Sequence, residues 1–264
     1  MGFETLLVER VGDVAEVTLN RPESMNAMDP QMAKDLSQLA IDCDTDPGVR
    51  AVLLTGAGRM FCAGGDLKGF AEQANIRAAL LGMAGDLHLG ISRLTRMNAP
   101  VIAAINGTAA GAGFSLAMAA DLAIAADNAV FTMAYTRAGL SPDGSSTFFM
   151  PRRIGDRRAR ELMLTNRVLS AQEALDWGIV NRVVPGDQLM ESARELAAEL
   201  AAGPTAAFGS VKTLLNASFD NGLEAQMELE SRAIAAMGAS ADGQEGIHAF
   251  VEKRKPNFTG GADA

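Results

Sequence analysis

The sequence predicts an α/β fold in which similar units of strand, glycine-rich loop and helix stack on one another, followed by a helical region. A short apolar run leads into a glycine-rich loop twice, over 51–67 and again over 101–113. After the Gly-Pro pair at 203–204 the apolar periodicity is helical only. Because 48% of the 264 residues are hydrophobic, such a chain can bury a sizeable core.

The N-terminal half supplies the strands. Residues 15–19 alternate apolar and polar side chains, which indicates a half-buried strand, and 30–43 follow as a helix. The runs AVLL at 51–54 and VIAAI at 101–105 are typical of strands buried on both faces. We expect the glycine-rich loop after each run to open at the end of its strand and to lead into a helix.

The C-terminal half contains the clearer helix signals. Ser170 and Glu173 form a capping box for a short helix. The next helix presents one apolar face, formed by Leu189, Ala193, Leu196 and Leu200. The Gly-Pro pair at 203–204 then breaks the chain, so we divide it into a core domain at 1–203 and a helical region at 204–264.

An apolar stripe runs along the helical region and needs a partner: Leu223, Met227, Ile234 and Met237. We expect these helices to pack on the core or on a neighbouring subunit. A solvated helical tail is the alternative, but it would leave the stripe exposed to water.

Composition argues against several classes of partner. With 32 acidic and 23 basic residues the net charge is −9, so the chain lacks the basic surface that binding to nucleic acid requires. Cys43 and Cys62 lack CxxC spacing, which disfavours both disulfides and a metal site, and we expect a cytoplasmic protein. The uncharged run at 101–120 contains three glycines and an asparagine, so no membrane span is expected.

The two glycine-rich loops are candidates for binding a negatively charged oxygen. Gly64 and Gly65 stand between a buried strand and a helix start, and the segment at 106–113 repeats that arrangement. Without a Cβ atom, a ligand can approach the backbone N–H groups closely, and a helix N-terminus favours negative charge. Two such N–H groups converging on one oxygen would form an oxyanion hole. For either loop alone, a tight strand-to-helix turn is an equally good interpretation.

Together, these segments resemble the enoyl-CoA hydratase/isomerase, or crotonase, family, and the similarity extends along nearly the whole chain. Further motifs that carry the resemblance are LNRPESMNAM at 19–28, GLSPDG at 139–144, LTNRVLSAQEALDWGIVNRVV at 164–184 and the closing FVEKRKPNFTG.

The resemblance implies a crotonase-like core, a stacked ββα spiral, with a C-terminal helical region for trimerisation. It implies that Gly65 and Ala112 donate the N–H groups of an oxyanion hole. It also implies a coenzyme A thioester as substrate, no permanently bound cofactor, and a homotrimer or dimer of trimers. The residues expected to contact the substrate are Ala63, Gly64, Gly65, Asp66, Leu67, Ala112 and Tyr135.

The expected chemistry depends on three positions. The hydratases of this family use two glutamates to activate water, and Ser115 and Tyr135 occupy those positions here. Asp143 remains, where several isomerases of the family carry an acidic residue. We therefore expect a 3-enoyl to 2-enoyl-CoA isomerase in which Asp143 moves the proton, as in the similar ring-modified phenylacetyl-CoA isomerase branch. The alternative is that Asp143 caps a helix starting near Ser145.

Other functions stay open at this point. Water held by Asp143 could support hydration of a 2-enoyl-CoA. The halobenzoyl-CoA dehalogenase branch places an aspartate at the position of Asp143 and a histidine near that of His88. A non-catalytic acyl-CoA-binding protein and a serine hydrolase, with Ser115, Asp187 and His248 in order, are further alternatives. Whether the acyl group is linear or aromatic does not follow from the sequence.

Overall fold

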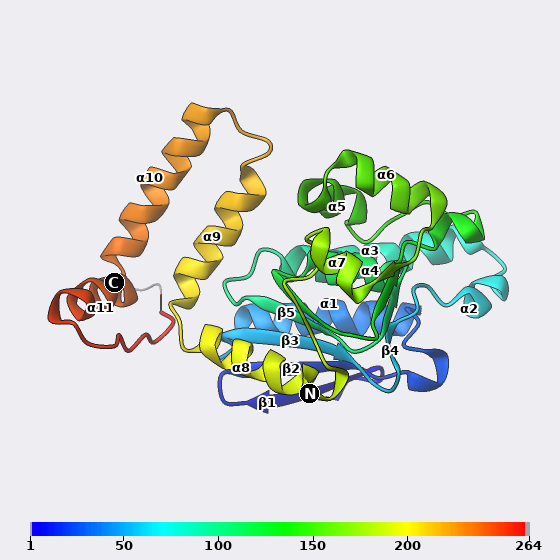
Figure 1. Ribbon diagram of the computed structural model, residues 1–264, viewed down its shortest axis with the longest axis horizontal. Coiled ribbons are helices and arrows are strands. Elements are labelled where there is room, and N and C mark those ends of the chain that lie inside the picture. Colours follow the sequence, from blue (N-terminus) through cyan, green and yellow to red (C-terminus); the bar gives the residue numbers. More distant parts are fainter. Residues whose placement is uncertain (1, 262–264) are drawn as a thin grey trace.

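The apolar runs form a six-stranded sheet in the computed structural model of the chain, which describes residues 2–261 (Figure 1). Its strand order is β1-β2-β3-β5-β7-β10, and only the β1–β2 pair is antiparallel. The strands span Leu6–Val11 (β1), Val14–Leu19 (β2), Ala51–Gly56 (β3), Val101–Ile105 (β5), Leu122–Ala126 (β7) and Arg182–Val184 (β10).

A second sheet of four short strands, in the order β4-β6-β8-β9, stands beside the first. They span Met60–Cys62 (β4), Thr108–Ala110 (β6), Val130–Thr132 (β8) and Leu169–Ser170 (β9). The chain repeatedly places one strand in the large sheet and the next in the small sheet: β3 with β4, β5 with β6, and β7 with β8. Helices follow these pairs, so the expected stacked ββα core is confirmed.

Strand β3 shows why the apolar runs are continuous. Val52 and Leu54 point into the core between the sheets and the first helices, whereas Ala51 and Leu53 point to the opposite face. That opposite face is covered by α8, whose buried residues include Ala193. Because successive side chains of a strand alternate between faces, a strand covered on both sides needs an apolar residue at each position.

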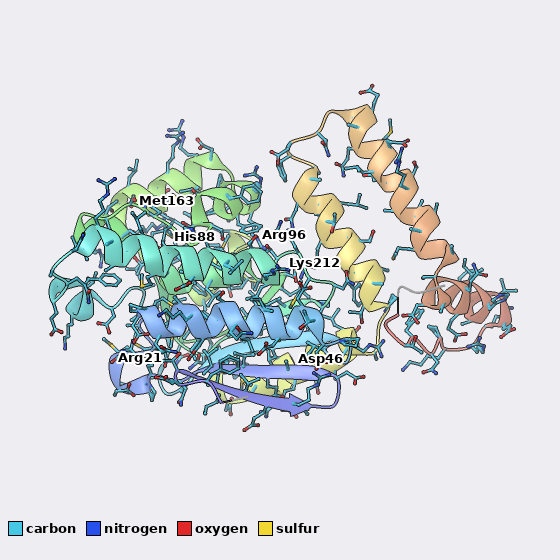
Figure 2. The ribbon with its side chains drawn as sticks, turned by 180° about the vertical axis from the view of Figure 1, so that it is seen from behind. Arg21, Asp46, His88, Arg96, Met163 and Lys212 are labelled. Atoms are coloured by element: carbon cyan, nitrogen blue, oxygen red, sulfur yellow. The ribbon has the colours of Figure 1, made fainter. Side chains whose placement is uncertain are left out.

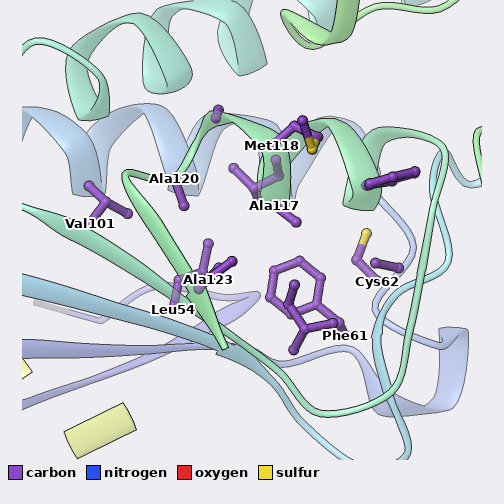
Figure 3. Close-up of a cluster of buried hydrophobic side chains, with 14 of the residues drawn as sticks. Leu54, Phe61, Cys62, Val101, Ala117, Met118, Ala120 and Ala123 are labelled. Atoms are coloured by element: carbon purple, nitrogen blue, oxygen red, sulfur yellow. The ribbon is translucent and has the colours of Figure 1, made fainter. Parts of the chain in front are cut away.

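Helices surround both sheets, and the core between them is filled mainly by small and sulfur-containing side chains. Figure 3 shows Phe61 and Cys62 of β4 close to Ala117 and Met118 of α4. The helices of this part span Pro30–Thr45 (α1), Leu67–Ala71 (α2), Ile76–Leu94 (α3), Ala112–Ala119 (α4), Ser146–Ile154 (α5), Asp156–Thr165 (α6), Ala171–Asp176 (α7) and Leu189–Ala201 (α8). The capping box of Ser170 and Glu173 at the start of α7 is confirmed.

Three further helices extend away from this core (Figure 1): α9 at Thr205–Ala217, α10 at Leu223–Ala239 and α11 at Ala241–Glu252. No residue of α10 is buried, and Leu223 and Ile234 of its apolar stripe are 68% and 75% exposed. The core therefore does not cover the stripe. The division at 203/204 falls between α8 and α9 and stays a prediction. Within residues 2–261, no helix is both long enough and apolar enough to cross a membrane.

Lys212 attaches α9 to the core, and Figure 2 labels it where this helix meets the core. Its ammonium group donates to the carbonyl oxygens of Leu94 and Ala99 at 2.9 and 3.0 Å and lies 2.8 Å from Asp121. Burial lowers the pKa of Lys212 despite the attraction of Asp121. A buried cation is stable only when such partners surround it.

Replacing Lys212 with Met should lower the free energy of unfolding by about 3 kcal/mol, because Asp121 and two carbonyl groups would lose their buried donor. Chemical denaturation of the two proteins measures the difference. The matched control is Lys34→Met at an exposed position, which should change stability by less than about 0.5 kcal/mol. Equal midpoints for Lys212→Met and the control would show that Lys212 does not hold α9.

Candidate active site

The two glycine-rich loops lie against each other. Strands β4 and β6, which lead into them, are parallel neighbours in the small sheet, so both loops leave the sheet at the same edge. Gly64 and Gly111 have φ of +100° and +49°. A Cβ atom on Gly64 would lie 3.4 Å from the Gly111 Cα and 3.1 Å from the Ala110 oxygen. Glycine at both positions therefore permits the backbone conformation and the close contact.

The next residue of each loop carries the backbone N–H group of interest. Gly65 follows Gly64, and Ala112 is the first residue of α4, where helix N–H groups have no partner within the helix. Within residues 2–261, neither N–H donates a hydrogen bond to the protein. The start of α4 sits directly on β4, because a Cβ atom on Gly113 would lie 2.5 Å from that of Cys62. Both N–H groups are thus fixed and free to bind a ligand oxygen.

Asp66 holds the first loop in place. Its carboxylate accepts hydrogen bonds from the Gly69 N–H at 3.2 Å and from the guanidinium of Arg21 at 3.1 Å. Burial acts in the opposite direction, but these hydrogen bonds lower the pKa of Asp66 below its ordinary value. The side chain caps α2 and does not line the cavity beside the loop. Its expected contact with substrate stays a prediction, and its geometry is that of a loop support.

A cavity of about 510 Å³ opens beside the two N–H groups. Ala63, Gly64, Gly65, Leu67 and Ala112 all line it, together with Tyr135 and Asp143. Most of the remaining wall is apolar and comes from α2, α3 and the segment that precedes α5. The largest of these side chains are Phe70, Ile76, Leu80, Leu81, Met83 and Leu140. An apolar cavity with a few convergent polar groups is typical of a small-molecule site.

Asp143 faces this cavity and does not cap a helix. One carboxylate oxygen, Oδ1, accepts a hydrogen bond from the Tyr135 hydroxyl at 2.7 Å. Helix α5 begins at Ser146, and Asp143 contributes only its backbone carbonyl there, which accepts from the Ser146 hydroxyl at 2.9 Å. The capping alternative is therefore wrong, and the second oxygen, Oδ2, has no hydrogen-bond donor within the described part of the chain.

His88 of α3 stands next to the same carboxylate, with Nε2 3.6 Å from Asp143 Oδ2. The same nitrogen accepts a hydrogen bond from the Gly144 N–H at 3.2 Å. A neutral imidazole that accepts through Nε2 carries its proton on Nδ1, so it cannot donate to Asp143. His88 is half exposed and lies outside the cavity lining.

Two hydroxyl groups connect Asp143 to the second glycine loop. Ser115 Oγ lies 3.0 Å from Tyr135 Oη and 3.2 Å from the Gly111 oxygen. Burial and the negative charge of Asp143 raise the pKa of Tyr135, so the phenol keeps its proton and donates it to the carboxylate. From the sequence we expected Tyr135 to contact the substrate and considered Ser115 as a nucleophile, but we did not predict the contact between them. A hydroxyl group at both positions was the available signal.

The serine hydrolase alternative is not supported by this arrangement. Ser115 is fully buried, and its hydroxyl contacts Tyr135 and a backbone carbonyl. His248 is exposed on α11, which lies apart from the core in Figure 1. A nucleophilic serine needs a base within hydrogen-bond reach. The Ser115 hydroxyl contacts neither His248 nor Asp187 in the described part of the chain.

Comparison with known proteins identifies the family of the chain. The family model described as enoyl-CoA hydratase/isomerase matches residues 9–261. The chain is 41% identical to a protein of Rhodobacter capsulatus named "Probable enoyl-CoA hydratase", over 98% of this chain and 100% of that one. It is also 41% identical to the 1,2-epoxyphenylacetyl-CoA isomerase of Escherichia coli, over 94% of this chain and 95% of the relative.

The solved structures that resemble the chain give the same assignment. A crystal structure of an enoyl-CoA hydratase from Polaromonas sp. JS666 superposes with a TM-score of 0.91 at 35% identity, covering 96% of this chain and 99% of that one. With a family model matched over nearly its whole length and the crotonase fold in its core, this chain belongs to the enoyl-CoA hydratase/isomerase family, whose members are acyl-CoA enzymes.

Proposed function

We propose that the enzyme shifts the double bond of 3-enoyl-CoA thioesters to the 2-position, with Asp143 as the acid and base. One observation carries the proposal. Among the described residues that line the cavity beside the Gly65 and Ala112 N–H groups, Asp143 is the one carboxyl group. A double-bond shift can be carried out by a single group that takes a proton from one carbon and returns it to another.

The proposed reaction has two proton transfers. Asp143 takes a proton from C2, and the electron pair of that bond moves into the thioester to form a dienolate, whose oxygen accepts hydrogen bonds from Gly65 and Ala112. Asp143 then returns the proton at C4, which moves the double bond to C2–C3 and restores the carboxylate. The two N–H groups stabilise the charge that develops on oxygen.

Hydration of a 2-enoyl-CoA is the second candidate. A relative named as a hydratase and a relative named as an isomerase are equally similar to this chain, at 41% identity. The two positions that carry glutamate in hydratases are Ser115 and Tyr135 here, so water would have to be activated by Asp143 alone. Because the cavity has no second carboxylate among the described lining residues, we favour the isomerase.

We propose that coenzyme A enters only as part of the substrate. The loop from Ala63 to Leu67 borders the cavity, and the apolar side chains of α3 suit an acyl group. Arg77 is the cationic side chain among the described lining residues and is available to a phosphate or carbonyl oxygen.

Asp143→Asn should lower kcat for 3-hexenoyl-CoA by about 10²–10⁴-fold, because the amide keeps the shape of the side chain but cannot accept the C2 proton. The conversion is followed spectrophotometrically as the 2-enoyl thioester forms. Asp187→Asn, at an exposed position after β10, is the matched control and should behave as wild type.

The products separate the alternatives. Isomerisation that survives in Asp143→Asn would contradict the proposed role of Asp143. A wild-type enzyme that hydrates crotonyl-CoA and leaves 3-hexenoyl-CoA unchanged would be a hydratase. Release of halide from 4-chlorobenzoyl-CoA would indicate the dehalogenase, and thioester binding without turnover of any of these substrates would indicate a binding protein.

The oxyanion hole can be tested at Ala112, because this residue is the first of its helix, where proline is tolerated. Ala112→Pro removes the N–H and should lower kcat by about 10²–10³-fold. Ala112→Gly keeps the N–H and should stay within a few-fold of wild type. Equal loss in both variants would mean that the side chain, and not the N–H, matters at this position.

We also propose that the enzyme is a homotrimer or a dimer of trimers, assembled through its C-terminal helices. Their apolar side chains are exposed to an extent that is unusual for a single chain: Leu215, Phe219, Leu223, Ile234, Phe250 and Val251 are 63–85% exposed. Exposed apolar surface of this kind is typical of protein–protein interfaces.

Sedimentation equilibrium should give three or six times the chain mass of 27.6 kDa. Leu223→Glu combined with Ile234→Glu should shift the protein to lower mass, because each would place a charge in an apolar interface. Glu230→Gln on the same helix is the control and should leave the mass unchanged. A wild-type protein that sediments as a monomer would contradict the proposal.

A further inference from the structure

A chain of hydrogen bonds links the carboxylate of Asp143 to the backbone of the second glycine loop. It runs from Asp143 Oδ1 to Tyr135 Oη (2.7 Å), to Ser115 Oγ (3.0 Å) and to the Gly111 oxygen (3.2 Å). Ser115 is fully buried and does not line the cavity, so it cannot touch the substrate. Its hydroxyl group has no evident use in the proposed reaction.

The protonation state of Asp143 sets the direction of this chain. While Asp143 is ionised, it can only accept, so the Tyr135 hydroxyl donates to it. Tyr135 Oη is then an acceptor for the Ser115 hydroxyl. The Ser115 hydroxyl has one proton but lies near two acceptors, Tyr135 Oη and the Gly111 oxygen. While it donates to Tyr135, it cannot donate to the Gly111 oxygen.

The direction can reverse once Asp143 carries a proton on Oδ1, the oxygen that contacts Tyr135. The carboxylic acid donates to Tyr135, Tyr135 donates to Ser115, and Ser115 donates to the Gly111 oxygen. Hydroxyl protons rotate about their C–O bonds to allow this, and the same heavy-atom distances serve both directions. No net proton moves along the chain.

The Gly111 carbonyl and the Ala112 N–H belong to the same peptide group. A hydrogen bond accepted by the carbonyl oxygen polarises the group and makes its N–H a stronger donor. The Gly111 oxygen already accepts from the Ser115 N–H at 2.9 Å within α4. The Ser115 hydroxyl therefore acts on the strength of an oxyanion-hole donor.

We infer that Tyr135 and Ser115 are positioning residues that strengthen the Ala112 N–H when Asp143 takes up the substrate proton. The inference rests on the proposed function. In the first step, the proton of C2 goes to Asp143 and the C2–H electron pair becomes part of the dienolate. The thioester oxygen therefore gains negative charge in the same step in which the hydrogen-bond chain reverses. When Asp143 returns the proton at C4, the thioester oxygen loses its charge and the hydrogen-bond chain takes its first direction again.

The packing around Ser115 fixes this geometry. A Cβ atom on Gly144 would lie 2.9 Å from the Ser115 Cβ, and Gly144 has a φ of +60°. A side chain at position 144 would therefore meet Ser115, so glycine there lets the segment before α5 pack closely against α4. At position 115 the small hydroxyl-bearing side chain fits, and alanine should fit equally well.

Ser115→Ala, Tyr135→Phe and the double variant test the inference. For 3-hexenoyl-CoA, Ser115→Ala should lower kcat roughly tenfold, which corresponds to the net contribution of one neutral hydrogen bond, and leave KM within about twofold. The double variant should be no slower than the slower single variant, because either change interrupts the same chain. Thr55→Val removes another buried hydroxyl, which donates to the Ala104 oxygen, and should keep the wild-type kcat.

A second measurement does not depend on turnover. The keto form of acetoacetyl-CoA has an acidic C2 proton that it can give to Asp143 in the site, so that an enolate is bound beside a protonated Asp143. Hexanoyl-CoA stays a neutral thioester and leaves Asp143 ionised. In Ser115→Ala, the Kd of acetoacetyl-CoA should rise roughly tenfold and that of hexanoyl-CoA should not change. A variant that merely loosened the structure would weaken both.

Two outcomes would overturn the inference. One is a Ser115→Ala enzyme with wild-type kcat and wild-type affinity for acetoacetyl-CoA, and the other is a double variant whose loss is the product of the two single losses. If Asp143→Asn is inactive while Ser115→Ala is normal, only this inference fails. If Asp143→Asn is active, the proposed function fails as well.

Discussion

The direct contact between Gly64 and Gly111 is the constraint on which the candidate site depends. It exists because β4 and β6 are parallel neighbours in the small sheet, so that their loops emerge side by side. Any side chain at Gly64 would meet the backbone of the other loop, 3.1 Å from the Ala110 oxygen. This contact positions the two free N–H groups and the start of α4. Both glycines also form part of the cavity wall.

The second constraint is the scarcity of charge around the cavity. Among the described residues that line the cavity, Asp143 is the one with a carboxylate. Ser115 and Tyr135, where the family resemblance places the glutamates of hydratases, carry hydroxyl groups. The neighbours of the Asp143 carboxylate are the Tyr135 hydroxyl, which donates to Oδ1, and His88, whose Nε2 lies 3.6 Å from Oδ2. A cavity with an apolar wall and one carboxylate is better suited to moving a proton within the substrate than to activating a water molecule. We therefore favour isomerisation over hydration.

Much of the fold could be predicted from the sequence, because the strongest signals come from burial. The continuous apolar runs at 51–54 and 101–105 identified strands covered on both faces, and Ser170 and Glu173 marked a helix start correctly. The strands of the small sheet were missed, since two or three residues are too few to show a period.

The site was predictable where it is made of backbone and less so where it depends on side-chain direction. The glycine-rich loops suggested exposed N–H groups, and the family resemblance assigned them to Gly65 and Ala112. Both residues line one cavity with Tyr135 and Asp143. The contact between Asp66 and Arg21 could not be predicted, because it joins residues 45 positions apart on two different loops. The contact between Ser115 and Tyr135 joins residues twenty positions apart and depends on the packing of α4.

The most direct test of the account follows one hydrogen atom. With 3-hexenoyl-CoA deuterated at C2, NMR of the first product should find 2-hexenoyl-CoA that carries part of the label at C4, because one carboxylate moves the proton across the face of the dienolate. A product whose C4 hydrogen comes from solvent in every turnover, or a 3-hydroxy thioester as the first product, would contradict the account.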